Sequence, residues 1–240
     1  AFRYVILVSS GIVVVVGFLV WFFMRMDKAS EQAIVMNKIT VSQIKEVLKL
    51  PAVILLMVII HCAYIGYKIT DIFSLYAQDV MLYDQVQSAQ VGTFLLFVRP
   101  IVGVIIGILA DRSQTTYWLL VSFVVSFFGA LLFATGVISD SSTALFFIST
   151  LVVATGVYAA RSLYFAVMER GKIPLVLTGT AVGLISIVGY TPDIFAGPAM
   201  GYLLDANSGA TGHQYVFGIL AIFSLIGGIA AWYYYKLYRK

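Results

Sequence analysis

Apart from Arg3, which is close enough to the outer interface to snorkel, six acidic or basic side chains lie inside stretches of the sequence that are apolar enough to cross a membrane. They are His61, Lys68, Asp71, Arg99, Arg161 and Asp193. A charge near a bilayer centre costs at least about 2.5–3.5 kcal/mol on insertion scales, so such residues usually face a protein interior or a water-filled cavity. The chemistry open to these residue types at that depth is the binding of a charged solute or of a proton.

These residues form two layers when depth is counted from the cytoplasmic helix ends. Arg161, His61 and Arg99 lie roughly 12, 15 and 18 Å deep at about 1.5 Å per helical residue. The other three lie roughly 25–30 Å deep on the same count. The middle layer is basic and holds no acid, as a site for an anion requires. We therefore expect Arg99 and Arg161 to attract an anion, and Lys68 to assist.

The basic residues also have structural interpretations, which the sequence leaves open. Arg99 and Arg161 could donate hydrogen bonds to backbone carbonyls of neighbouring helices. Lys68 and Asp71 stand three residues apart on one helix and could neutralise each other.

A coupled proton has three candidate carriers, Asp71, Asp193 and His61. Asp193 follows Pro192, where a kink can expose backbone, and it could carry a proton or pair with Lys68. A histidine at the position of His61 is more often a packing residue than a proton relay.

The composition places these residues in a membrane protein. Of the 240 residues, 61% are hydrophobic and only 11% are charged; a soluble globular domain carries about 25% charged residues. Cys62 is the only cysteine, so we expect no disulfide, no metal site of cysteine and histidine, and no cofactor. The formal charge of +4 comes from basic residues beside the apolar stretches, which indicates membrane topology rather than nucleic-acid binding.

Apolar stretches long enough to cross a bilayer, about 20 residues each, recur along the whole chain. They are residues 2–24, 51–77, 87–110, 115–137, 144–168, 174–204 and 215–235. All should be helical, because an open strand in lipid would leave backbone groups without hydrogen bonds. The sequence therefore predicts an all-α membrane protein with seven transmembrane helices.

The distribution of Lys and Arg between the spans predicts the orientation. The connections around 78–86, 138–143 and 205–214 hold no basic residue, whereas the alternate connections hold most of them. By the positive-inside rule the basic connections are cytoplasmic, so the N-terminus lies outside and the C-terminus inside. The three tryptophans agree, since each sits at an inferred cytoplasmic helix end.

The chain divides into a leading helix (1–24), a cytoplasmic connecting loop (25–50) and a six-helix domain (51–240). In that domain the first two spans of each trio carry the buried charges, whereas the third spans, 115–137 and 215–235, carry none. This pattern predicts two related three-helix repeats whose third helices face lipid and whose first two face a cavity.

The connecting loop contains a candidate interfacial helix. Thr40 and Gln43 form a capping-box pattern, and the apolar residues that follow share one helical face. We expect a short helix along the inner membrane surface before Pro51 opens the next span, with a solvated linker as the alternative.

A short motif ends the 87–110 span on its cytoplasmic side. The stretch Gly107-Ile108-Leu109-Ala110-Asp111-Arg112 resembles the Gly-x-Leu-Ala-Asp-Arg motif that the major facilitator superfamily places between its second and third helices and, more weakly, between its eighth and ninth. Gly107 and Gly103 would permit close helix contact. Asp111 could cap a neighbouring helix N-terminus while Arg112 forms a salt bridge on the inner face, so the pair could latch one conformation.

Two further stretches bear on this resemblance. After Arg112, Ser113-Gln114-Thr115-Thr116 replaces the usual glycine and second basic cluster, which predicts a reduced latch. The stretch Gly197-Pro198-Ala199-Met200-Gly201 resembles the Gly-Pro-x-x-Gly of the fifth helix, whose counterpart is the eleventh. In the family such a stretch bends and packs helices near the interface between the two halves.

The resemblance covers the whole chain and implies the second six-helix half of a major facilitator, preceded by the sixth helix. It implies alternating access, in which two halves rock about a central site. Because Ala1 stands within hydrophobic sequence without an initiator methionine, we expect a piece of a longer protein whose N-terminal half shares the cavity.

The family also suggests substrate classes. Arg99-Pro100 resembles the Arg-Pro at which nitrate porters hold their anion, but their glycine-dense signature in the eleventh helix is not matched. Organic-anion porters for sugar acids, phosphorylated compounds or carboxylates also use buried Arg and Lys near the midplane. We therefore expect a proton-coupled secondary transporter of a small organic anion in the plasma or inner membrane.

Other function classes predict different features. A transporter of a neutral sugar or drug-like solute would leave the arginines with structural roles. An ion channel would need a ring of like groups from identical subunits. We do not expect an enzyme, because His61 and Cys62 adjoin on one helix and point to different faces, and no catalytic cluster stands out in the sequence.

Overall fold

The computed structural model describes residues 2–23 and 40–238, and every regular element within these ranges is a helix. The chain forms two compact units, Ala1–Val41 and Ser42–Lys240. Among the described residues, 7 helices are long and apolar enough to cross a membrane, which confirms the predicted all-α membrane protein. The first of them, α1 (Phe2–Phe23), belongs to the first unit and is apolar along most of its length.

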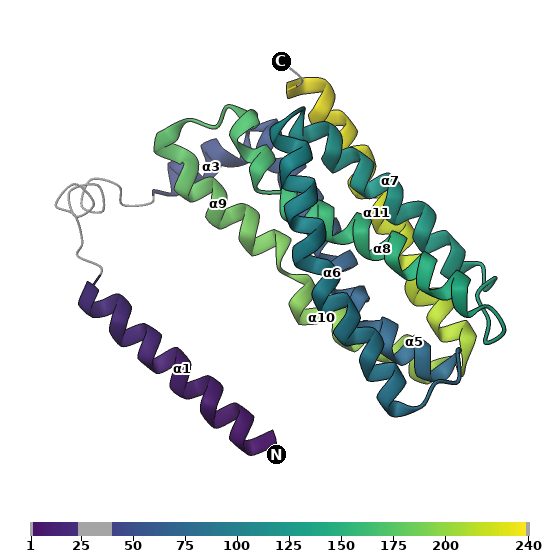
Figure 1. The fold of residues 1–240 in the computed structure, drawn as a ribbon. Coiled ribbons are helices and arrows are strands. Elements are labelled where there is room, and N and C mark those ends of the chain that lie inside the picture. Colours follow the sequence, from purple (N-terminus) through teal and green to yellow (C-terminus); the bar gives the residue numbers. More distant parts are fainter. Residues whose placement is uncertain (1, 24–39, 239–240) are drawn as a thin grey trace. The chain divides into compact units, whose positions relative to one another are not determined.

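The remaining helices form a bundle (Figure 1). They are α3 (Val41–Leu48), α4 (Pro51–Ile69), η1 (Thr70–Ile72), α5 (Phe73–Asp79), α6 (Gln85–Asp111), α7 (Thr115–Ala134), α8 (Thr143–Leu163), η2 (Ala166–Gly171), α9 (Leu175–Gly189), α10 (Pro192–Ala206) and α11 (Ala210–Tyr238). Two crossings are composite, because α4 continues through the 3₁₀ turn η1 into α5, and α9 is followed by α10. The predicted span 144–168 ends earlier, at Leu163, since the residues after it turn into the 3₁₀ helix η2.

Local signals in the sequence determine where several helices begin. Pro51 opens α4 and Pro192 opens α10, because proline has the φ of a first helical turn and its missing N–H would be unpaired there in any case. A capping box opens α6. The Gln87 N–H donates to Asp84 Oδ1 at 2.8 Å, and the Asp84 N–H donates to Gln87 Oε1 at 3.3 Å.

The helix predicted within the connecting loop is present as α3. Its Val47 is fully buried, but Leu48, which was expected on the same face, is exposed. Residues 25–39 of the predicted loop lie outside the described residues.

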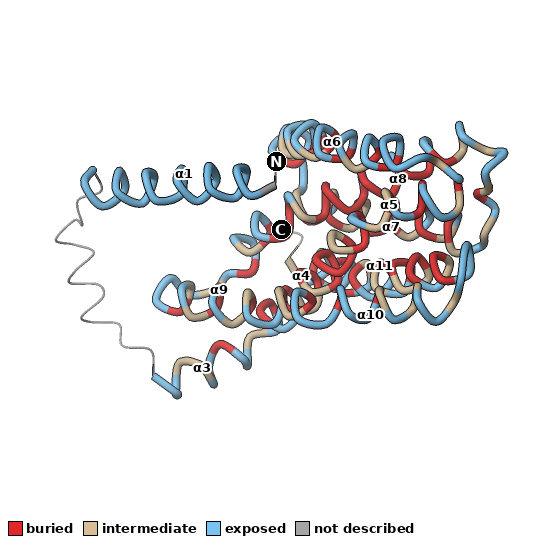
Figure 2. Tube along the Cα trace, turned by 90° about the horizontal axis from the view of Figure 1, so that it is seen from below, coloured by how far each residue is buried: buried red, intermediate tan, exposed pale blue. Residues whose placement is uncertain are grey.

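The core of the second unit lies around α4, which is its most buried crossing (Figure 2). Helix α4 contacts α8, α9, α10 and α11, and α7 packs along α11 and α8. The α6 crossing and the α9–α10 crossing are the least buried of this unit. The helices that carry Arg99 and Asp193 therefore keep open faces, whereas the third helices of the predicted trios, α7 and α11, pack on each other.

Candidate functional site

One face of α4 carries the side chains around which the candidate site is built. Tyr64, Tyr67 and Lys68 are three and four residues apart, so they line up along one side of the helix. Neighbouring helices contribute the other charged groups, namely Arg99 from α6, Arg161 from α8 and Asp193 from α10. The two layers that the sequence predicts meet at these tyrosines.

Lys68 and Asp193 form an ion pair across α4 and α10. The Lys68 Nζ lies 3.2 Å from Asp193 Oδ1, and the two side chains are 28% and 50% exposed. The Tyr64 hydroxyl lies 3.1 Å from Asp193 Oδ1 and 2.9 Å from Oδ2, and it donates to this carboxylate. Of the two carboxylates that could have paired with Lys68, Asp71 and Asp193, it is Asp193 that forms the ion pair. Asp71 falls in the 3₁₀ turn η1, is exposed and forms no ion pair with any described residue.

Arg99 and Arg161 lie against tyrosine rings. The Arg161 Cζ is 3.6 Å from the centroid of the Tyr67 ring and 5.4 Å from that of Tyr64. The Arg99 Cζ is 4.7 Å from the Tyr67 centroid and 5.2 Å from that of Tyr158. Both guanidinium groups therefore share one aromatic ring within cation–π range.

Neither arginine forms an ion pair within residues 2–23 and 40–238, although Asp71 interacts electrostatically with both and Asp193 with Arg161 from a greater distance. The Arg99 Nε and Arg161 Nη1 atoms are buried and have no hydrogen-bond acceptor there. Within the described residues, no backbone carbonyl accepts a hydrogen bond from these two atoms. This disfavours a purely structural role for the two arginines. Two desolvated donors next to one ring, with no carboxylate of the described residues in direct contact, suit a carboxylate or phosphate.

Further tyrosines extend the site toward α9. The Tyr64 and Tyr190 rings meet edge to face at 4.7 Å between centroids, and the Tyr190 and Tyr164 hydroxyl oxygens are 3.2 Å apart. Sequence reasoning singled out none of these tyrosines. A signal existed, because Tyr64, Tyr67 and Lys68 repeat at helical spacing, and Tyr158 and Arg161 do the same on α8.

His61 contacts the residues that connect α9 to α10 and not the arginine cluster. Pro192 has no N–H, so the Val188 carbonyl four residues earlier accepts from the Thr191 N–H at 3.3 Å instead of from residue 192. The His61 Nδ1 lies 3.2 Å from this carbonyl oxygen, and Thr191 Oγ1 donates to it at 2.7 Å. The ring also packs against Phe195. These contacts favour the packing interpretation of His61 over a proton relay.

The motif at the end of α6 is only partly as expected. A Cβ at Gly103 would lie 3.4 Å from Ser162 Oγ, in agreement with a close approach of α6 and α8, but a Cβ at Gly107 would meet nothing within 4 Å. Helix α7 begins after Gln114 without a side-chain cap from that residue, and the expected cap of a neighbouring helix by Asp111 stays a prediction. Arg112 is exposed and forms no ion pair within the described ranges.

The Gly-Pro stretch lies in the middle of α10. Pro198 is inside the helix, and a Cβ at Gly197 or Gly201 would meet nothing within 4 Å. A side chain at either glycine would therefore meet no other described residue, so the expected packing at an interface between two halves stays a prediction.

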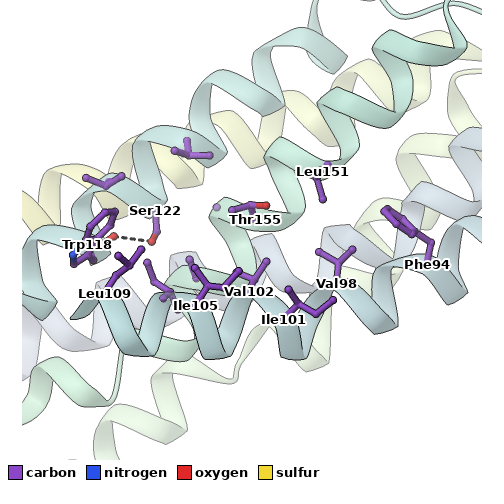
Figure 3. Close-up of a pocket in the computed structure, with 15 residues that line it drawn as sticks. Phe94, Val98, Ile101, Val102, Ile105, Leu109, Trp118, Ser122, Leu151 and Thr155 are labelled. Carbon is purple, nitrogen blue, oxygen red and sulfur yellow. Dashed lines mark hydrogen bonds between the residues drawn. The ribbon is translucent and has the colours of Figure 1, made fainter. Parts of the chain in front are cut away.

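An apolar cavity of the bundle lies away from these residues. An apolar groove of about 520 Å³ runs between α6, α7 and α8, from Phe94 to Trp118 (Figure 3). None of the predicted substrate or proton residues lines it. Of its polar side chains, Ser122 already donates to the Trp118 carbonyl at 2.7 Å. The groove offers little that could bind a polar solute, so the candidate site is the charged cluster.

Comparison with known proteins supports the membrane assignment. No family model matches the chain. A stretch of 75 residues, 31% of the chain, is 39% identical to the inner membrane protein YihN of Escherichia coli strain K12. Over 216 residues, 88% of the chain, it is 24% identical to the inner membrane protein YqcE of the same organism. No solved structure matches.

These similarities cover only part of each relative. The matched residues make up 18% of YihN and 51% of YqcE, so the chain spans about half the length of these relatives or less. Both relatives are described only as inner membrane proteins. Together with the apolar helices, this makes the chain part of a multi-pass membrane protein.

Proposed function

We propose that this chain is the C-terminal half of a secondary transporter of the major facilitator type, which moves a small organic anion by alternating access, coupled to protons. The observation that carries the proposal is the pair of guanidinium groups, Arg99 and Arg161, held at 4.7 and 3.6 Å from the centroid of one ring. No acid among the described residues pairs with either of them. A charge arranged in this way at membrane depth needs a counter-ion from outside the chain.

The neighbouring side chains favour an organic anion over a small inorganic one. Arginine presents several N–H donors in a plane, which matches carboxylate and phosphate groups. Tyrosine rings around the cluster supply apolar surface for a carbon skeleton, and their hydroxyl groups can bond to sugar-like hydroxyls. We therefore place sugar acids, phosphorylated compounds and carboxylates first among the substrates.

The second half of the transporter would come from the remainder of the longer protein. Support comes from the length of the relatives and from the open helix faces, where a Cβ at Gly107, Gly197 or Gly201 would meet nothing within 4 Å. We place the other half against these faces. In our proposal the protein lies in the inner membrane, with the N-terminus of this segment outside and the C-terminus in the cytoplasm.

The proposal is tested with the full-length protein in proteoliposomes. Uptake of labelled gluconate and glycerol 3-phosphate is measured under an inward proton gradient, with unlabelled glucose as a neutral competitor. We expect saturable uptake of at least one anion that collapses when the proton gradient is abolished and that glucose does not inhibit. Equal inhibition by glucose would favour a neutral substrate, and current without saturable flux would indicate a channel.

A further inference from the structure

We propose that Lys68 moves between Asp193 and the bound anion, and that Asp193 takes up the coupled proton when Lys68 leaves it. This inference rests on the anion site proposed above and adds the group that couples it to protons. Three observations carry it, namely the contacts of Lys68, the contacts of Asp193 and the balance of charge around them.

Lys68 is free to exchange partners. Its only ion pair within the described residues is the 3.2 Å contact with Asp193 Oδ1, and its side chain is 28% exposed. It follows Tyr67 directly on α4, and Tyr67 is the ring against which both arginines lie. An ammonium on a flexible four-carbon chain can turn from the carboxylate to an anion held beside that ring.

This exchange would leave the Asp193 carboxylate without its ion-pair partner. The groups that face it are Lys68 and Tyr64 from α4 and the Arg161 charge from α8. Tyr64 donates to the carboxylate, and its ring also lies 5.4 Å from the Arg161 Cζ. Once an anion occupies Arg161 and Lys68 has turned away, only the Tyr64 hydroxyl remains to stabilise the charge of Asp193.

The charge balance then requires a proton. A negative charge at membrane depth is costly without a cation beside it, so a proton from solvent binds to a carboxylate oxygen of Asp193. The side chain is 50% exposed, so it is not sealed within the bundle, and in this proposal the proton reaches it from the transport cavity. Lys68 keeps its own proton throughout. When the anion leaves, Lys68 returns to Asp193 and the carboxylate releases the same proton, so one proton travels with one anion.

The other candidate carriers fit this role less well. Asp71 interacts electrostatically with Lys68, Arg99 and Arg161, but it forms no direct ion pair with any described residue. His61 is engaged with the Val188 carbonyl at 3.2 Å and the Phe195 ring. Among the described carboxylates of the site, Asp193 is the one in direct contact with a cation that anion binding would draw away.

Proton uptake on anion binding tests the inference directly. Gluconate, glycerol 3-phosphate or succinate is added to the full-length protein in weakly buffered detergent solution, and proton uptake is followed with a pH dye while calorimetry gives the bound fraction. We expect uptake of about one proton per anion bound, with affinity falling about tenfold for each unit of rising pH. Binding of an anion without proton uptake by the wild-type protein would overturn the inference.

Variants then identify the group. Asp193→Asn should bind the anion with an affinity that no longer depends on pH and should take up no proton, whereas Asp193→Glu should retain uptake. Asp140→Asn, an exposed loop carboxylate, is the control and should match the wild type. Persistent uptake in a folded Asp193→Asn protein, or loss of uptake in Asp71→Asn instead, overturns the assignment.

Binding and proton uptake fail separately, so these experiments distinguish an error in the proposed anion site from an error in the role of Asp193. Failure of every anion to bind, or binding unaffected by loss of Arg99 and Arg161, removes the anion site and the inference with it. Binding that depends on both arginines but moves no proton removes only the inference.

Discussion

The guanidinium carbon of Arg161 lies 3.6 Å from the centroid of the Tyr67 ring, with the Arg99 guanidinium 4.7 Å from the same centroid. Two like charges would repel each other in a site of low dielectric constant. The electron-rich face of one tyrosine offsets part of that repulsion and holds both groups in place without neutralising them. In the proposed transporter, Tyr67 would therefore position both arginines for the anion.

The first prediction concerns this ring. Tyr67→Leu should weaken anion binding by about 5- to 30-fold, because about 1–2 kcal/mol of cation–π interaction no longer positions the arginines. Tyr67→Phe keeps the ring and should bind within a few-fold of the wild type. Calorimetric titration of both variants with gluconate and glycerol 3-phosphate checks this. Equal losses in the two variants would mean that the hydroxyl, and not the ring, is what matters.

The second prediction concerns His61 and the break between α9 and α10. His61→Leu should lower the free energy of unfolding by about 1–2 kcal/mol, because the Val188 carbonyl loses a donor. Pro192→Ala restores a backbone N–H that can donate to the same carbonyl, so in that background the loss should shrink. Thermal melting of the two single variants and the double variant gives the comparison. An undiminished loss would show that His61 acts through something other than this carbonyl.

The third prediction concerns the contact of α7 with α8 at Gly156. A Cβ there would lie 2.5 Å from Ser126 Oγ and 2.8 Å from the Ser122 carbonyl oxygen. Gly156→Ala should therefore cost about 1–3 kcal/mol or more, since backbone as well as side chain must move. Gly179→Ala is the matched control, because nothing lies within 4 Å of that position. Detergent melting curves should show a lowered midpoint for the first variant only.

The fourth prediction concerns a buried histidine outside the site. His213 is fully buried, its Nε2 lies 3.0 Å from Asp79 Oδ2, and its Nδ1 has no hydrogen-bond partner within the described ranges. Asp79→Ala leaves both ring nitrogens unsatisfied, so we expect a loss of about 1–3 kcal/mol in the free energy of unfolding. Asp140→Ala, in an exposed turn, should leave stability unchanged. Equal melting of the two variants would show that this contact contributes nothing.

The spans could be predicted from the sequence because the bilayer sets their length and forbids unpaired backbone. The start at Pro51 followed from proline's fixed φ in the same way, whereas Pro192 was expected to kink one span and instead opens the separate helix α10. The end of the fifth span was placed too late, because the apolar residues after Leu163 continue the hydropathy signal although the chain turns there into η2. Hydropathy indicates which residues are compatible with lipid, but it does not show where a helix ends.

The site could be predicted only as a list of charges. Lys68 had two carboxylates at compatible depth, and the choice of Asp193 depends on how α10 faces α4, which spacing along one helix does not reveal. Tyr67 gains its role from arginines on two other helices.

The central claim is that Arg99 and Arg161 hold an anion, and the affinity of the full-length protein for gluconate and glycerol 3-phosphate tests it most directly. For at least one of these anions, Arg99→Ala and Arg161→Ala should each lower the affinity by about 10- to 100-fold, the loss expected for hydrogen bonds to a charged group worth about 1.5–3 kcal/mol. Arg112→Ala, which removes an exposed arginine at the end of α6, should leave it unchanged. Wild-type affinity in both Arg99→Ala and Arg161→Ala would contradict the claim.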